Sequence, residues 1–156
     1  MEFYCGRWYR NLNYITHQLK NMKIKIGLVD DHQLFLKSLG LMLANFKKYE
    51  VILEALNGKE LQEKIRQLGS PPEIIFIDVN MPVMGGIETA AWLSANYPNI
   101  YLVALSMNDS DKTIISMIKA GCCAFLLKDI HPNELEKAIE EIRGVIEKSS
   151  RLTSRN

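Results

Sequence analysis

The chain has 156 residues, of which 47% are hydrophobic and 24% are charged, a balance that suits one globular domain with a buried core. Its 19 basic and 18 acidic residues leave a formal net charge of +1, so the composition does not predict direct binding to nucleic acid. No apolar run is long enough to span a bilayer, and charged residues interrupt the N-terminus where a signal peptide needs an unbroken apolar stretch.

Residues 1–21 are rich in aromatic and amide side chains and show no clear periodicity. Two interpretations of this extension stay open. It is either poorly ordered, or it forms one helix over residues 11–21 that docks on the domain or on a partner.

From Lys23 onward, short apolar runs alternate with longer segments of helical periodicity. The runs at residues 24–29, 51–55, 74–77, 101–105 and 124–127 are β-branched or aliphatic, which indicates parallel strands buried on both faces. The segments that follow these runs have apolar residues at helical spacing, which predicts one helix after each strand. These apolar sets are Phe35/Leu39/Met42/Phe46, Leu61/Ile65/Leu68, Ile87/Ala90/Ala91/Leu93, Ile114/Ile115/Ile118 and Leu135/Ala138/Ile139/Ile142.

Five strands, each followed by a helix, predict an α/β fold in which a doubly wound five-stranded parallel sheet forms the middle of a three-layer sandwich. The patterned domain covers residues 22–146. Residues 147–156 are polar, and we expect this C-terminal tail to fray.

The three cysteines, Cys5, Cys122 and Cys123, match neither a disulfide framework nor a zinc site in number and spacing. We therefore expect reduced thiols, as in a cytoplasmic protein. Cys122 and Cys123 are expected to pack as small apolar residues.

Polar residues stand where four of the predicted strands end: Asp30 and Asp31, Asp78, Ser106, and Lys128. The carboxyl ends of parallel strands meet at one edge of the sheet, where ligands bind. Crowded carboxylates without a Cys/His cluster favour a hard cation, Mg²⁺ rather than zinc. Such an ion, with an ammonium and a hydroxyl nearby, suits a phosphoryl group.

Each of these residues alone has a plainer explanation. Asp30 and Asp31 could cap a helix, Ser106 could be an ordinary strand-end hydroxyl, and Lys128 could be a solvated charge. His32 is expected at the surface, opening the first helix, and not as a metal ligand. The combination at four strand ends favours the phosphoryl chemistry.

Four stretches, in this order, resemble the receiver domains of two-component response regulators: Leu28-Val29-Asp30-Asp31, Ile77 to Gly86, Leu105-Ser106 and Leu126-Leu127-Lys128. The resemblance covers about residues 23–145 and implies a flavodoxin-like fold. It implies that Asp78 is the phosphoacceptor and that Lys128 and Ser106 contact the phosphoryl group. It also implies that Ser106 and Phe125 form the switch. The implied Mg²⁺ ligands are Asp30, Asp31, Asp78 and the backbone carbonyl of Asn80.

The resemblance implies partners as well. A sensor histidine kinase or a phosphotransfer protein would donate the phosphoryl group, and an output protein or domain would read the phosphorylated state. The chain would not be an enzyme with many substrates, although loss of its own phosphate is expected.

Residues 30–35 and 121–129 resemble receivers that precede a LuxR-type helix-turn-helix domain, and such proteins are often dimers. A homodimer is therefore left open. No recognition helix follows residue 146, so the chain is either a fragment of such a regulator or a free-standing receiver. Neither DNA nor a membrane is an expected partner of this chain itself. Lys128 is followed by Asp129, where many receivers carry proline.

Three other functions remain as alternatives. A flavin- or nucleotide-binding module would need a Gly-rich or hydroxyl-rich phosphate loop after the first strand, where Asp30 and Asp31 stand. A Mg²⁺-dependent phosphohydrolase usually has a second acid two residues after its nucleophile, where Asn80 stands. The third alternative is a receiver that accepts no phosphate and acts only as a docking surface.

Overall fold

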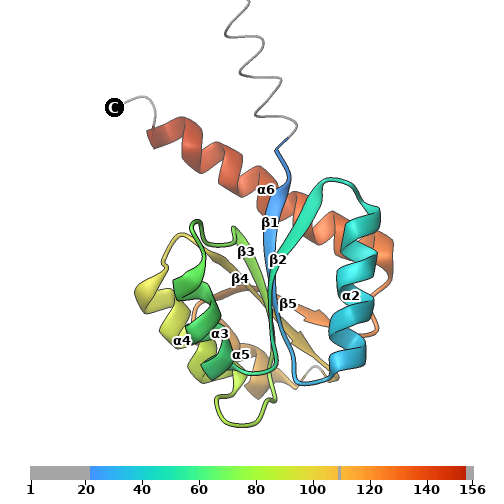
Figure 1. Cartoon of the computed structure of the whole chain (residues 1–156), viewed down its shortest axis with the longest axis vertical. Helices are drawn as coiled ribbons and strands as arrows, with labels where there is room; N and C mark the ends of the chain where they lie inside the picture. Colours follow the sequence, from blue (N-terminus) through green and yellow to red (C-terminus); the bar gives the residue numbers. More distant parts are fainter. Residues whose placement is uncertain (1–21, 109, 154–156) are drawn as a thin grey trace, which may run out of the picture.

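In the computed structural model of this protein, residues 22–108 and 110–153 are described, and they fold around one five-stranded sheet. All neighbouring strands are parallel, in the order β2-β1-β3-β4-β5 (Figure 1). The strands are β1 (Ile24–Val29), β2 (Tyr49–Ala55), β3 (Ile74–Asp78), β4 (Tyr101–Ser106) and β5 (Cys122–Leu127). The helices are α2 (Gln33–Asn45), α3 (Gly58–Gln67), α4 (Gly86–Asn96), α5 (Asp111–Lys119) and α6 (Pro132–Thr153).

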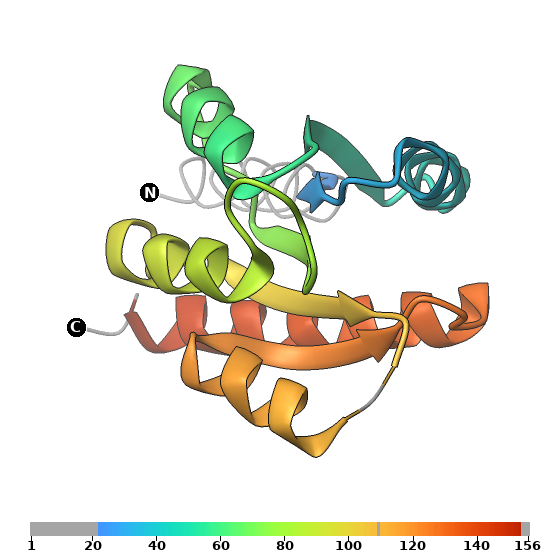
Figure 2. The same cartoon turned by 90° about the horizontal axis from the view of Figure 1, so that it is seen from below.

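Helices cover both faces of the sheet (Figures 1 and 2). Helices α2 and α6 lie on one face, where Leu43 and Ile139 are fully buried. Helices α3, α4 and α5 lie on the other face, where Leu61, Leu93 and Met117 are fully buried. The predicted three-layer α/β sandwich with a doubly wound parallel sheet is therefore confirmed.

All five predicted strands form, and the three central strands are the ones buried between the two helical layers, whereas the edge strands β2 and β5 are only partly buried. Every residue of β3 is buried, and β1 and β4 each have only one residue that is not. Continuous burial explains why these runs are apolar throughout instead of alternating. The strand order puts β3 at the centre, between β1 and β4, so the ends of these three strands are neighbours.

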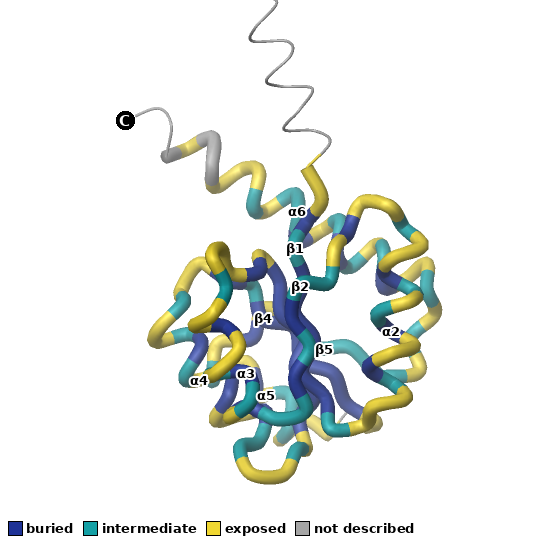
Figure 3. Tube along the Cα trace, viewed as in Figure 1, coloured by how far each residue is buried: buried dark blue, intermediate teal, exposed yellow. Residues whose placement is uncertain are grey.

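The faces that the helices bury differ in part from the predicted ones (Figure 3). In α5 the buried residue is Met117, whereas Ile115 and Ile118 are 51% and 55% exposed. In α4 the predicted Ile87 is 45% exposed. Apolar residues on these helices occupy two adjacent stripes, and rotation of the helix against the sheet decides which stripe is buried. That rotation is a tertiary property, so periodicity alone did not identify the stripe.

The C-terminal tail is a second difference. Residues 147–153 belong to α6, which continues to Thr153. Arg143 Nε donates to Glu147 Oε1 over 3.1 Å, an interaction one helical turn apart. Glu and Lys are also good helix formers, so a polar sequence extends the helix without any apolar stripe. The predicted extension over residues 1–21 lies outside the described residues.

Candidate functional site

Asp30 and Asp78 meet at the carboxyl edge of the sheet. Val29 is paired with Ile77, so the residues that follow them, at the ends of the adjacent strands β1 and β3, come together. The Asp30 N–H donates to the carbonyl of Ala55 over 3.0 Å, which holds the chain in place just after β1. Both carboxylates are buried, with Asp30 only 2% and Asp78 only 4% exposed.

Lys128 reaches these carboxylates from the far side of β4. Its backbone N–H donates to the carbonyl of Ser106 over 2.8 Å, which anchors the residue just after β5. Its Nζ lies 2.6 Å from Oδ2 of Asp30 and 3.2 Å from Oδ1 of Asp78, and its side chain is 5% exposed. One buried cation is thus shared between two buried carboxylates.

Asp31 and His32 complete the cluster at the start of α2. Asp30, Asp31, His32 and Asp78 each have one side-chain ligand atom in this cluster, and these four atoms lie within 4.8 Å of one another. His32 Nδ1 lies 3.4 Å from Asp30 and 3.6 Å from Asp31, while its ring is 68% exposed. The backbone N–H of His32 donates a hydrogen bond to Oδ1 of Asp30 over 2.8 Å.

The electrostatics of the cluster favour an added cation. Burial and the nearby Asp30 carboxylate raise the pKa of Asp78 to about 6, although Lys128 acts in the opposite direction. Oδ1 of Asp31 is buried and accepts no hydrogen bond in the described part of the chain. Three carboxylates against one ammonium leave negative charge uncompensated, and the donors are mainly hard oxygens. This donor set fits Mg²⁺.

The other predicted site residues lie at the end of β4, on β5 and in the loop after β3. Ser106 is buried at the end of β4, next in the chain to Leu105, which pairs with Asp78. Its Oγ accepts a hydrogen bond from the N–H of Asn108 over 3.3 Å. Phe125 lies in β5, half-buried against the apolar core that α3, α4 and α5 cover. Asn80 is exposed, two residues beyond Asp78 in the loop between β3 and α4.

Gly86 lets this loop pack directly against the strand that carries Asp78. Its N–H donates to the carbonyl of Val79 over 3.0 Å. A Cβ on Gly86 would overlap the carbonyl oxygen of Asp78 and would lie 2.8 Å from Cα of Val79. Only glycine allows this approach without moving the backbone next to Asp78.

The response regulator receiver domain model matches residues 26–140, which is most of the chain. The chain belongs to the response regulator receiver family. It is 34% identical over 122 residues to the transcriptional regulatory protein MctR of Rhizobium johnstonii, covering 78% of this chain and 56% of MctR. It is 33% identical over 116 residues to the response regulator GacA of Pseudomonas protegens, covering 74% of this chain and 54% of GacA. The chain thus spans about half the length of the curated relatives that it matches.

Solved receivers have the same fold. A CheY-like receiver domain protein from Methanospirillum hungatei superposes with a TM-score of 0.73 and 26% identity, over 82% of this chain and 98% of that one. The receiver domain of the putative response regulator NarL from Mycobacterium tuberculosis superposes with a TM-score of 0.71 and 26% identity. The match covers 78% of this chain and 96% of the NarL receiver chain. A LuxR-family response regulator from Aurantimonas also matches, with a TM-score of 0.70 and 26% identity over 77% of this chain and 84% of that one. The expected resemblance to LuxR-type receivers is therefore confirmed.

Membership of the family confirms the coarse expectations about function. Receivers are signalling domains of two-component systems rather than enzymes in the usual sense, and they bind Mg²⁺ at an acidic pocket. The relatives of this receiver are transcriptional regulators. None of the described helices is long and apolar enough to cross a membrane.

Two contacts of the receiver site were not expected from the sequence. A ring nitrogen of His32 faces the carboxylates, although its exposure was predicted correctly. The position of His32 directly after Asp31 was a signal for this proximity. The ring centroid of Phe35 lies 4.8 Å from Nζ of Lys128, whereas the sequence indicated only a core residue at this position. Nothing local connects Phe35 with Lys128.

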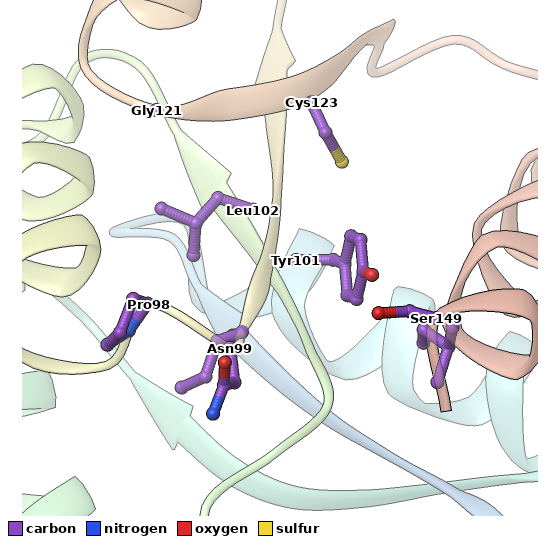
Figure 4. Close-up of a pocket in the computed structure, with 9 residues that line it drawn as sticks. Pro98, Asn99, Tyr101, Leu102, Gly121, Cys123 and Ser149 are labelled. Carbon is purple, nitrogen blue, oxygen red and sulfur yellow. The ribbon is translucent and has the colours of Figure 1, made fainter. Parts of the chain in front are cut away.

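A hollow of about 720 Å³ lies at the opposite edge of the receiver, where β4 and β5 begin (Figure 4). It contains no carboxylate, so it is unsuited to the cation chemistry of the cluster. Its lining residues are Pro98, Asn99, Ile100, Tyr101, Leu102, Gly121, Cys123, Ile146 and Ser149.

Proposed function

We propose that Asp78 is the phosphoacceptor of this receiver. The observation that carries the proposal is the buried Asp78 carboxylate at the end of β3, with Lys128 Nζ 3.2 Å away and Asp30 and Asp31 beside it. An Asp78 oxygen attacks the phosphorus of a phosphohistidine. The P–N bond breaks, and its electron pair stays on the imidazole nitrogen, which takes up a proton from solvent. Asp78 becomes an acyl phosphate.

Asp30, Asp31, Asp78 and the backbone carbonyl of Asn80 are the proposed Mg²⁺ ligands. Two observations support this assignment: Oδ1 of Asp31 is buried without accepting a hydrogen bond from the described residues, and the carboxylates lie close together. When bound, Mg²⁺ would neutralise charge on the phosphoryl oxygens. Asp30 is held by the hydrogen bond from its N–H to Ala55 and by the one its Oδ1 accepts from the backbone N–H of His32, so this carboxylate is preorganised.

Lys128 and Ser106 are proposed to contact the transferred phosphoryl group, Lys128 as a charge and Ser106 as a hydrogen-bond donor. Phosphorylation adds charge and strong acceptors at the sheet edge. Ser106 then moves toward the phosphoryl group, and Phe125, half-buried on β5, turns inward. This change biases the surface formed by α5, β5 and α6 between two states, which a partner can distinguish.

The proposed phosphoryl donor is a sensor histidine kinase or a phosphotransfer protein, and the reader is an output protein or domain. The relatives that are named as transcriptional regulators support an output in gene regulation, through a domain outside residues 22–146 or through a separate protein. A homodimer remains an option. The near-neutral charge gives this chain no support for DNA binding of its own. The free thiols of Cys122 and Cys123 support a cytoplasmic location.

Intact-mass spectrometry after incubation with acetyl phosphate and Mg²⁺ tests the proposal. We expect one labile phosphoryl adduct in the wild type, absent in Asp78→Asn and present in the control Asp111→Asn, which changes an exposed carboxylate at the start of α5. Loss of the adduct after removal of the donor measures self-dephosphorylation. An adduct that persists in Asp78→Asn would refute the assignment. Sustained release of phosphate from unrelated esters would favour a hydrolase instead.

A further inference from the structure

Within the described part of the chain, the ammonium group of Lys128 lies near the carboxylates of Asp30 and Asp78 and the ring of Phe35. The ring centroid lies 4.8 Å from Nζ, within the range of a cation–π interaction. With the lysine side chain only 5% exposed, water screens this attraction little. The ring therefore contributes to where the ammonium lies.

Phe35 is held in place by α2, the helix that begins just after Asp30 and Asp31. It lies in the first turn of α2, directly after the turn that contains Asp31 and His32. Its side chain is half-buried and packs against the apolar cluster under α2 and α6. The ring is thus a rigid part of the wall of the site, on the side of the sheet that α2 covers.

We infer that Phe35 is a positioning residue that holds the ammonium group of Lys128 at the phosphoryl-accepting position, an inference that rests on the proposed function. Both carboxylate partners of Lys128 belong to the proposed cation site, so they would be shared between the lysine and the ion. The Phe35 ring is not a ligand of the proposed cation, so it stays available to Lys128 when the cation binds. It keeps Nζ near Asp78 while the charges around it change.

The local sequence makes such a support useful. Lys128 is followed by Asp129, where many receivers carry proline. The backbone of Lys128 is held by the hydrogen bond from its N–H to the carbonyl of Ser106. That bond fixes the backbone but leaves four side-chain torsions to be set by whatever surrounds the ammonium. The two ion pairs and the ring set them here.

The kinetic test compares Phe35→Leu with Phe35→Tyr, measuring the rate of phosphorylation over a range of acetyl phosphate concentrations with Mg²⁺. Phe35→Leu keeps an apolar side chain but removes the ring, and we expect its maximal rate to fall by about 3- to 30-fold, the range that a partly or fully desolvated cation–π contact implies. The half-saturating donor concentration should change little. Phe35→Tyr retains a ring and should restore the rate to within about twofold.

Phe46→Leu is the matched control, because Phe46 also packs half-buried against the apolar cluster under α2 and α6 but lies at the other end of α2. It removes a ring of the same size from the same cluster, so it reports the general effect of loosened packing. We expect it to lower the free energy of unfolding and to leave the maximal rate unchanged. An equal loss of rate in Phe46→Leu and Phe35→Leu would overturn the inference.

Nuclear magnetic resonance gives a readout that does not depend on activity. Protons on the ε-carbon of Lys128, assigned by their loss in Lys128→Arg, should be shifted upfield by the ring current of Phe35 in the wild type. The shift should remain in Phe35→Tyr and disappear in Phe35→Leu. Ordinary lysine shifts in the wild type would overturn the inference even if the leucine variant failed to fold.

The two proposals can fail separately. A wild-type chain that takes up no phosphoryl group would refute the proposed function, whatever the lysine resonances show. A wild type that is phosphorylated on Asp78, together with a Phe35→Leu variant of unchanged rate and unchanged lysine shifts, would refute only the role of Phe35.

Discussion

Nζ of Lys128 lies 3.2 Å from Oδ1 of Asp78, although their strands, β5 and β3, are separated by β4. The lysine side chain crosses the end of β4 to make this contact. It neutralises part of the charge of Asp30 and Asp78, whose side chains are 2% and 6% exposed. The stability of the folded protein therefore depends strongly on this one ammonium group.

Removal of that ammonium should destabilise the protein. We expect Lys128→Met to lower the free energy of unfolding by about 3–5 kcal/mol without divalent cations, because Asp30 and Asp78 would be left buried and unpaired. Urea denaturation with EDTA measures the loss, and excess Mg²⁺ should recover part of it. Lys37→Met removes an exposed ion pair with Glu54 and should change the stability by about 1 kcal/mol or less. Equal effects of the two substitutions would contradict the prediction.

The raised pKa of Asp78 predicts a dependence of stability on pH. Asp78 keeps its proton up to about pH 6 in the folded protein, because its pKa is raised to about 6 from the 3.8 of an unperturbed aspartate. The stabilising contribution of this proton is therefore complete below pH 3.8 and is lost as the pH rises through about 6. At pH 7 without divalent cations, Asp78→Asn should exceed the wild type in unfolding free energy by about 1–3 kcal/mol. Below pH 4 the two should converge. Denaturation between pH 3.5 and about 8 in chelator measures the difference. A difference that is independent of pH would argue against a raised pKa.

Gly86 should tolerate no side chain. Gly86→Ala places a methyl group against the backbone of Asp78 and Val79, so we expect a loss of about 2 kcal/mol or more and weaker Mg²⁺ binding. Gly144→Ala is the matched control, because Gly144 lies within α6 and a Cβ there meets no atom within 4 Å. That substitution should raise the stability by about 0.5–1 kcal/mol. Thermal unfolding and Mg²⁺ titration measure both variants. A stable Gly86→Ala variant with unchanged Mg²⁺ affinity would count against the close packing.

Val83 should be replaceable by glycine with a gain in stability. Its φ is 68°, a left-handed conformation that is unfavourable for a β-branched residue, and the residue is 82% exposed. Val83→Gly should raise the free energy of unfolding by about 0.5–1 kcal/mol, the strain relieved less the added entropy of the unfolded chain. Lys47, with φ of 54° just after α2, should respond similarly to Lys47→Gly. Calorimetry measures both variants, and a loss of stability in Val83→Gly would show that the loop is not strained there.

The sequence by itself determined the strands and which polar residues stand at their ends. Burial on both faces requires a continuous apolar run, so the first polar residue after each run marks the end of a strand. Asp30, Asp78, Ser106 and Lys128 could be recognised in this way. The alternation of strands and helices was enough to predict a parallel sheet covered on both sides.

Only the tertiary structure decided which of these ends meet. Strand order brings Asp78 beside Asp30, and the length of a lysine side chain brings Lys128 to both. The rotation of α5 buries Met117 and exposes Ile118, and the packing of α2 turns Phe35 toward Lys128. Periodicity records the apolar stripes of a helix but neither its rotation against a sheet nor distances between residues far apart in the chain. Those quantities are set by packing of the whole domain.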